Sequence, residues 1–203
     1  MSERKTLIVP SLDLPPAHIN FGVVTGDGVP DYENRKGRGD GMEYVMTIKV
    51  DKATKKQIQE EFLEYWEDNK SKKAPKKPDN FDGLFWENED GDTLFSARTK
   101  TEFNGKPKTI QITDAKNNKL DPEVFGSIGD GSTGRIVTNL SIYNEGSDDE
   151  GIGYYLEAVR LITFSPYTGG SIEIDEEEGD ALGGGGAPAE KKKGKKKKKK
   201  SKE

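Results

Sequence analysis

Basic and aromatic side chains share a face in two segments that alternate between apolar and polar residues. Because successive side chains of a strand point to opposite faces, Arg98 and Lys100 lie together on one strand, and Arg135 and Tyr143 on another. Lysine and arginine contact phosphates, and an aromatic ring stacks on an unpaired base at about 1–3 kcal/mol per base. The two strands therefore indicate a surface for single-stranded nucleic acid. The same pattern also fits a face that is simply solvated, so both interpretations stay open.

A second group of cations lies in a glycine-rich loop. This loop, residues 26–41, contains Arg35, Lys36 and Arg38, which suit either closure on a phosphate backbone or a solubilising loop tip. Lys106 follows the first of the two strands and is a further candidate for contact with nucleic acid. The candidate nucleic-acid-binding residues are Arg35, Lys36, Arg38, Arg98, Lys100, Lys106, Arg135 and Tyr143.

The sequence contains little that indicates an enzyme active site or a metal site. The chain has no cysteine and one histidine, His18, which excludes disulfides, thiolate metal sites and multi-histidine metal centres. The glycine-rich residues 126–134 lack the Gly-Lys-Ser/Thr ending of a P-loop and precede a strand rather than a helix. The acidic loop at residues 145–150 lacks the spacing of calcium ligands. We therefore expect a protein that is not an enzyme and has no cofactor.

Short strands and a single helix must position these residues. Helical periodicity, preceded by Asp51 as an N-cap, predicts a helix over residues 52–69. Strands that do not alternate with helices favour a barrel over a βαβ fold, and a small barrel with one inserted helix is the layout of an OB-fold. We expect a mainly β protein: an OB-fold barrel of five to six short strands with one inserted α-helix and disordered termini. Alternation predicts strands near residues 19–23, 42–50, 93–103, 110–113, 135–143 and 154–164.

Composition divides the chain into three parts. Hydrophobic residues make up only 31% of it, but the polar excess is concentrated at the C-terminus. Residues 171–190 hold seven acidic residues and no basic one, whereas residues 191–203 hold ten lysines and one glutamate. Such blocks of like charge bury too little surface to fold. We predict an N-terminal arm (1–16), an OB-fold domain (17–170) with a helical excursion (52–79), and a disordered acidic and then polylysine tail (171–203).

The order of these segments resembles the single-stranded DNA-binding proteins of short-tailed, podovirus-type bacteriophages. The segments are EYVMTIKVDK before the helix, FDGLFWENEDGDTLFSARTKTEF, IQITDAKNNKL, SIGDGSTGRIVTNLSIY and GYYLEAVRLITFSPYTGG. The resemblance implies an OB-fold that binds single-stranded DNA without strong sequence preference, in replication and recombination. It also implies that Tyr143 is a stacking aromatic, and that an acidic C-terminal tail contacts the replication polymerase and helicase-primase. This chain departs from the family because it ends in lysines.

The expected function is therefore protection and organisation of single-stranded DNA in the cytoplasm of an infected bacterial host. We expect no membrane partner, because no apolar run approaches the ~20 residues that span a bilayer. The tail is expected to modulate DNA and partner binding, and the oligomeric state stays open between monomer and homodimer. Two alternatives also stay open: a metal-dependent nuclease or resolvase that acts on branched DNA, and an RNA-binding OB-fold protein.

Overall fold

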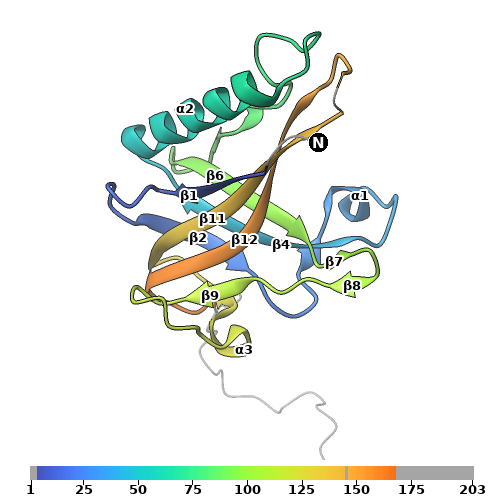
Figure 1. Cartoon of the computed structure of the whole chain (residues 1–203). Helices are drawn as coiled ribbons and strands as arrows, with labels where there is room; N and C mark the ends of the chain where they lie inside the picture. Colours follow the sequence, from blue (N-terminus) through green and yellow to red (C-terminus); the bar gives the residue numbers. More distant parts are fainter. Residues whose placement is uncertain (1–3, 145, 168–203) are drawn as a thin grey trace, which may run out of the picture. The chain divides into compact units, whose positions relative to one another are not determined.

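Five strands close into a barrel in the computed structural model, which describes residues 4–144 and 146–167 (Figure 1). Around the barrel, β2 pairs with β4, β4 with β6, β6 with β12, β12 with β11, and β11 with β2. Only the β6–β12 pair is parallel in this ring. The strands are β1 (Lys5–Val9), β2 (Ala17–Val23), β3 (Val29–Pro30), β4 (Met42–Lys49), β5 (Trp86–Glu87), β6 (Thr93–Lys100), β7 (Glu102–Phe103), β8 (Lys106–Pro107), β9 (Gln111–Thr113), β10 (Ser127–Ile128), β11 (Ser132–Tyr143) and β12 (Gly151–Thr163).

One long helix, α2 (Lys52–Asn69), is inserted between β4 and β6. Asp51 caps its N-terminus by accepting a hydrogen bond from the Thr54 backbone N–H at 2.7 Å. The buried face of α2 includes Phe62, whose ring meets Tyr154 edge-on at a centroid distance of 5.4 Å. The helix thereby lies against β1 and β11 and covers one end of the barrel (Figure 1). The predicted mainly β fold, with a small OB-like barrel and this inserted helix, is confirmed.

The N-terminal segment differs from the predicted arm. Lys5–Val9 forms β1, which pairs antiparallel with β11, and the side chains of Leu7 and Val9 are buried in the core. The prediction of a segment without regular structure is therefore wrong for these five residues. The prolines that suggested an arm begin only at Pro10, after the strand has ended.

Four other segments differ from the predicted structure. The loop at residues 26–41 contains β3 and a four-residue helix, α1 (Tyr32–Arg35). The strand predicted to extend to Phe103 ends at Lys100, and a short hairpin of β7 and β8 follows it. A second four-residue helix, α3 (Pro122–Phe125), precedes β10. The 3-10 helix η1 covers Phe81–Gly83.

The predicted tail, residues 171–203, lies outside the described residues. No helix in the described part of the chain is long and apolar enough to cross a bilayer.

Candidate nucleic-acid interface

A groove of about 860 Å³ lies over the outer face of β11 and β12, beside the end of β6 and the β7–β8 hairpin. Its walls contain four cations, three carboxamide or hydroxyl groups from Asn and Ser, and the aromatic rings of Phe103 and Tyr155. The lining residues are Arg4, Thr99, Lys100, Glu102, Phe103, Asn104, Lys106, Pro107, Lys108, Asn139, Ser141, Tyr155 and Glu157. Two predicted residues, Lys100 and Lys106, are thus brought together.

The β7–β8 hairpin forms one wall of the groove because its turn sequence is Asn-Gly. Asn104 and Gly105 have φ values of 52° and 70°, and a two-residue hairpin turn requires this left-handed backbone. The Lys108 backbone N–H donates to the Thr101 carbonyl at 2.8 Å and closes the base of the hairpin, and the Thr101 N–H joins it to β4 by donating to the Met42 carbonyl at 3.1 Å. As a result, Phe103 and Lys106 project into solvent, and the Phe103 side chain is 68% exposed.

The groove holds cations that have no carboxylate partner among the described residues. Lys108 is neutralised, because its Nζ donates to Glu157 Oε1 at 2.9 Å. Arg4, Lys100 and Lys106 make no ion pair within residues 4–144 and 146–167. Three cations are therefore available to an anionic ligand.

Two tyrosines occupy the same outer face of β11 and β12, and each lies beside a glycine. Tyr155 is 43% exposed and pairs in register with Asn139. A Cβ atom added to Gly153 would lie 2.7 Å from the Tyr155 ring, and one added to Gly151 would lie 2.3 Å from the Tyr143 hydroxyl oxygen. The two rings thus lie over the backbone of β12 where the glycines leave room for them.

Tyr143 continues this face toward the tip of the β11–β12 hairpin. It is four residues beyond Asn139, which corresponds to about 13 Å along the strand. Burial raises the pKa of the Tyr143 hydroxyl, and the negative charges of Asp79 and Asp149 raise it further. Tyr143 therefore stays a neutral ring at physiological pH, half-buried and outside the groove itself.

Arg98 and Arg35 meet at one carboxylate on the neighbouring part of the barrel. Arg98 pairs with Glu43, and Arg35 approaches the same Glu43 Oε1 to 3.4 Å. Both cations are partly neutralised, so they have less charge to offer a phosphate than Lys100 has.

The remaining cations of the glycine-rich loop surround an exposed tyrosine. Arg38 pairs with Glu33 at 2.7 Å, and its guanidinium lies 5.6 Å from the centroid of the Tyr32 ring. The Lys36 Nζ lies 5.7 Å from the same centroid. Residues 30–38 thus form a small cation–aromatic cluster that is separate from the groove residues.

Arg135 does not face the groove, and the prediction that placed it on a solvated strand face is wrong. Its side chain is buried beneath the segment that follows β1, and its guanidinium donates to the carbonyls of Pro10 (3.1 Å), Ser11 (2.5 Å) and Leu14 (2.8 Å). Burial, together with the nearby charge of Arg160, lowers its pKa. Arg135 therefore fastens the N-terminal segment to the barrel.

Sequence reasoning missed Arg4, Phe103, Lys108 and Tyr155. Tyr155 follows Tyr154 directly, and only one of the two rings can face outward on a strand. The pattern alone does not choose between them, because a bulge shifts the register of β12 against β11. Phe103 alternates in phase with the buried Phe95, and the break in the strand at Thr101 is what places it in solvent.

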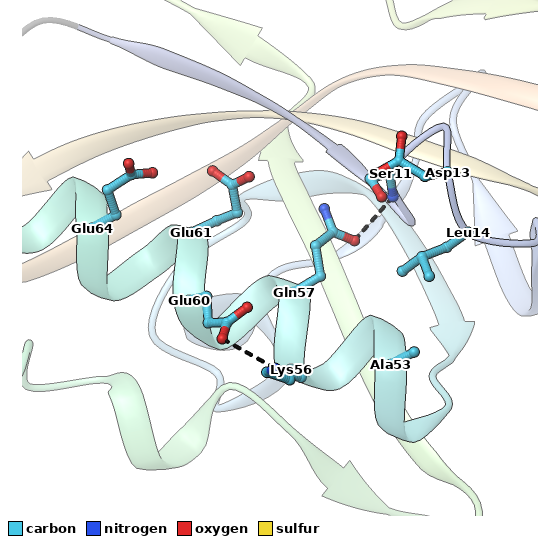
Figure 2. A pocket seen from close by; sticks show the side chains of 9 residues that line it. All are labelled: Ser11, Asp13, Leu14, Ala53, Lys56, Gln57, Glu60, Glu61 and Glu64. Carbon is cyan, nitrogen blue, oxygen red and sulfur yellow. Dashed lines mark hydrogen bonds and ion pairs between the residues drawn. The ribbon is translucent and has the colours of Figure 1, made fainter.

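A second hollow, of about 530 Å³, lies between α2 and residues 11–14 (Figure 2). Asp13, Glu60, Glu61 and Glu64 give it an acidic wall, and Lys5 bridges Glu61 and Glu64 at 2.7 Å each. An acidic wall repels phosphates, so this hollow does not belong to the candidate interface. Among the described residues, no three histidine or carboxylate side chains gather closely enough to hold a metal ion.

Comparison with known proteins finds likeness only among solved structures. No family model and no curated protein matches the chain. The single-stranded DNA-binding protein gp2.5 of bacteriophage T7 is 18% identical, with 89% of this chain and 100% of that chain covered and a TM-score of 0.47. The single-stranded DNA-binding protein of bacteriophage Enc34 is 14% identical, with coverages of 77% and 84% and a TM-score of 0.43. Its complex with single-stranded DNA gives 16% identity, 74% and 86% coverage, and a TM-score of 0.45.

All three are structures of bacteriophage single-stranded DNA-binding proteins. At these identities no residue role transfers to this chain.

Proposed function

We propose that the protein binds single-stranded DNA without sequence preference, through the groove over β11 and β12. The supporting observation is that exposed aromatic rings and cations without an ion pair among the described residues line one groove. Arg4, Lys100 and Lys106 contact phosphates, and Phe103 and Tyr155 stack on bases. Tyr143 supplies a third ring further along the sheet.

This arrangement favours a single strand over a duplex. In a duplex the faces of the bases are already stacked on one another, so exposed rings have nothing to stack on. A groove that contacts the backbone through lysine and arginine, and the bases through stacking on aromatic rings, binds with little sequence dependence.

The biological role that follows is protection and organisation of single strands during phage DNA replication and recombination, in the cytoplasm of the host. In this role the acidic residues 173–180 compete with DNA for the groove, and the lysine run at 191–200 opposes that competition. The tail is also the proposed contact for the replication polymerase and helicase-primase. The protein acts by binding and not by catalysis.

Two variants separate the electrostatic and the stacking contributions. The double variant Lys100→Gln/Lys106→Gln should weaken binding and reduce the slope of log K against log salt by about 0.7 for each lost phosphate contact. Tyr155→Ala should weaken binding without changing the slope, because stacking releases no counterions. The matched control is Lys116→Gln/Lys119→Gln, which removes the same charge from the exposed loop after β9.

Equal effects of the groove and control variants would show that only net charge matters. That result would overturn the assignment of the groove.

A further inference from the structure

The segment that follows α2 is fixed against the β11–β12 hairpin. This connector, residues 70–80, is rich in lysine and proline. The indole Nε1 of Trp66 donates to the Pro75 carbonyl at 3.2 Å, and the Asn80 side chain donates to the Ile152 carbonyl at 2.8 Å and accepts from the Ile152 N–H at 3.3 Å. Pro78 is buried. The connector therefore has a defined path over the barrel.

A buried carboxylate joins the connector to the hairpin. Glu150, at the base of the hairpin tip, is fully buried and accepts hydrogen bonds from the backbone N–H groups of Ser71 (2.8 Å) and Gly146 (2.6 Å). Its own carbonyl accepts from the Asp79 N–H at 3.1 Å. No described cation pairs with this carboxylate, so its charge is satisfied by backbone donors that hold the two segments together.

The connector presents cations that nothing in the described chain neutralises. Lys72, Lys73 and Lys76 are exposed and make no ion pair or ring contact within the described residues, whereas Lys77 pairs with Asp82 at 3.6 Å. Three like charges on one fixed segment repel one another, and an anionic ligand would relieve that repulsion.

The connector lies where the aromatic face of the hairpin ends. Asp79 of the connector is close enough to Tyr143 to raise the pKa of its hydroxyl. In Figure 1 the loop after α2 lies beside the tip of the β11–β12 hairpin, the same hairpin that carries Tyr155 in the groove. The groove, Tyr143 and the connector thus follow one another along the hairpin.

We propose that Lys72, Lys73 and Lys76 form a second phosphate-binding surface, which a nucleic-acid strand reaches only after it has filled the groove and passed Tyr143. This inference rests on the proposed function, because it extends the path of the same strand. Its consequence is that strand length decides whether the connector contributes. Strands confined to the groove do not contact it, and longer strands do.

The test compares two strand lengths and two triple variants of the full chain. Lys72→Gln/Lys73→Gln/Lys76→Gln removes the connector charges, and Lys52→Gln/Lys116→Gln/Lys119→Gln removes the same charge from exposed positions elsewhere. Binding is measured by fluorescence anisotropy across a salt series. The oligothymidylates have about 5 nucleotides, near the lower end of OB-fold site sizes (~4–16), and about 30 nucleotides, well above them.

On the long strand the connector variant should lose up to about 2 units of salt slope, at ~0.7 for each of three phosphates. On the short strand it should bind like the control variant. All six substituted lysines are exposed, and a thermal melt of each variant verifies that it is folded.

The other outcomes each contradict a stated claim. If the parent binds the long strand and the connector variant matches the control on it, the second surface does not exist, and the proposed function stands. If the connector variant loses the same slope on both strands, the connector belongs to the groove and not to a later part of the path. If the parent binds neither strand, the proposed function fails, and this inference fails with it.

Discussion

Substitution of Gly153 by alanine should weaken DNA binding without removing any side chain that contacts DNA. The added Cβ would lie 2.7 Å from the ring of Tyr155, so the ring must move off the strand. The protein should stay folded, because Gly→Ala stabilises a compatible site by ~0.4–1 kcal/mol and an off-rotamer ring costs ~0.5–1.5 kcal/mol. The two contributions nearly cancel, and the melting temperature should change little.

The expected effect on binding follows from the stacking energy. A base that loses its ring loses about 1–3 kcal/mol, which corresponds to a roughly 5- to 150-fold weaker Kd. The salt slope should stay at the parent value, because no cation is removed. Fluorescence anisotropy on one labelled oligonucleotide across a salt series gives the Kd and the slope together.

Two variants complete the comparison. Tyr155→Ala measures the loss of affinity when the ring is removed altogether. Gly83→Ala is the matched control, because its added Cβ would meet nothing within 4 Å. If Gly153→Ala binds like the parent while Tyr155→Ala binds weakly, the position of the ring over Gly153 is unimportant. If both bind like the parent, the stacking surface lies elsewhere.

Three further predictions concern other parts of the chain. Arg135→Gln should destabilise the fold by about 3 kcal/mol in a denaturant titration, because it leaves one buried and two partly buried carbonyls without their donor. It should not change the salt slope of the folded protein, and a changed slope would return Arg135 to the interface. Burial raises the pKa of Glu150, but the hydrogen bonds from Ser71 and Gly146 outweigh this effect and hold the pKa below its ordinary 4.5. The stability that the Glu150 carboxylate contributes is therefore present above about pH 4.5 and is lost as the pH falls through the pKa of the folded state. Glu150→Gln should therefore lower stability at pH 7 and flatten its acid dependence, and equal acid melting curves would refute this role. Deletion of residues 190–203 should weaken DNA binding at low salt, because the lysine run is lost and the acidic residues stay. Deletion of residues 171–203 should largely restore binding. If the variant that lacks only residues 190–203 binds as tightly as the full chain at every salt concentration, the lysine run is inert.

The sequence predicts an element well when the residues that determine it all lie within that element. The helix at residues 52–69 was predictable to the residue, because its apolar spacing and the Asp51 cap are properties of one continuous segment. Long-range contacts were not predictable in the same way. β1 has only three consecutive apolar residues, Leu7–Val9, and its partner strand lies more than 120 residues away.

The same distinction applies to the interface. Lys100 and Lys106 are exposed cations near a strand end, which the sequence shows directly. Arg135 has the same sequence pattern, but the carbonyls that hold it come from a segment more than 120 residues earlier. Tyr155 could not be separated from Tyr154, because the choice depends on how β12 pairs with β11 and β6.

The most direct test of the central claim is a competition between single-stranded and duplex DNA. A labelled oligonucleotide bound to the full-length protein at moderate salt is displaced with unlabelled single strands of several sequences, with the matching duplex, and with RNA of the same sequence. We expect single-stranded DNA to compete best, with little dependence on its sequence. Stronger competition by the RNA would make the protein an RNA-binding OB-fold protein, and equal or stronger competition by the duplex would contradict the proposed function.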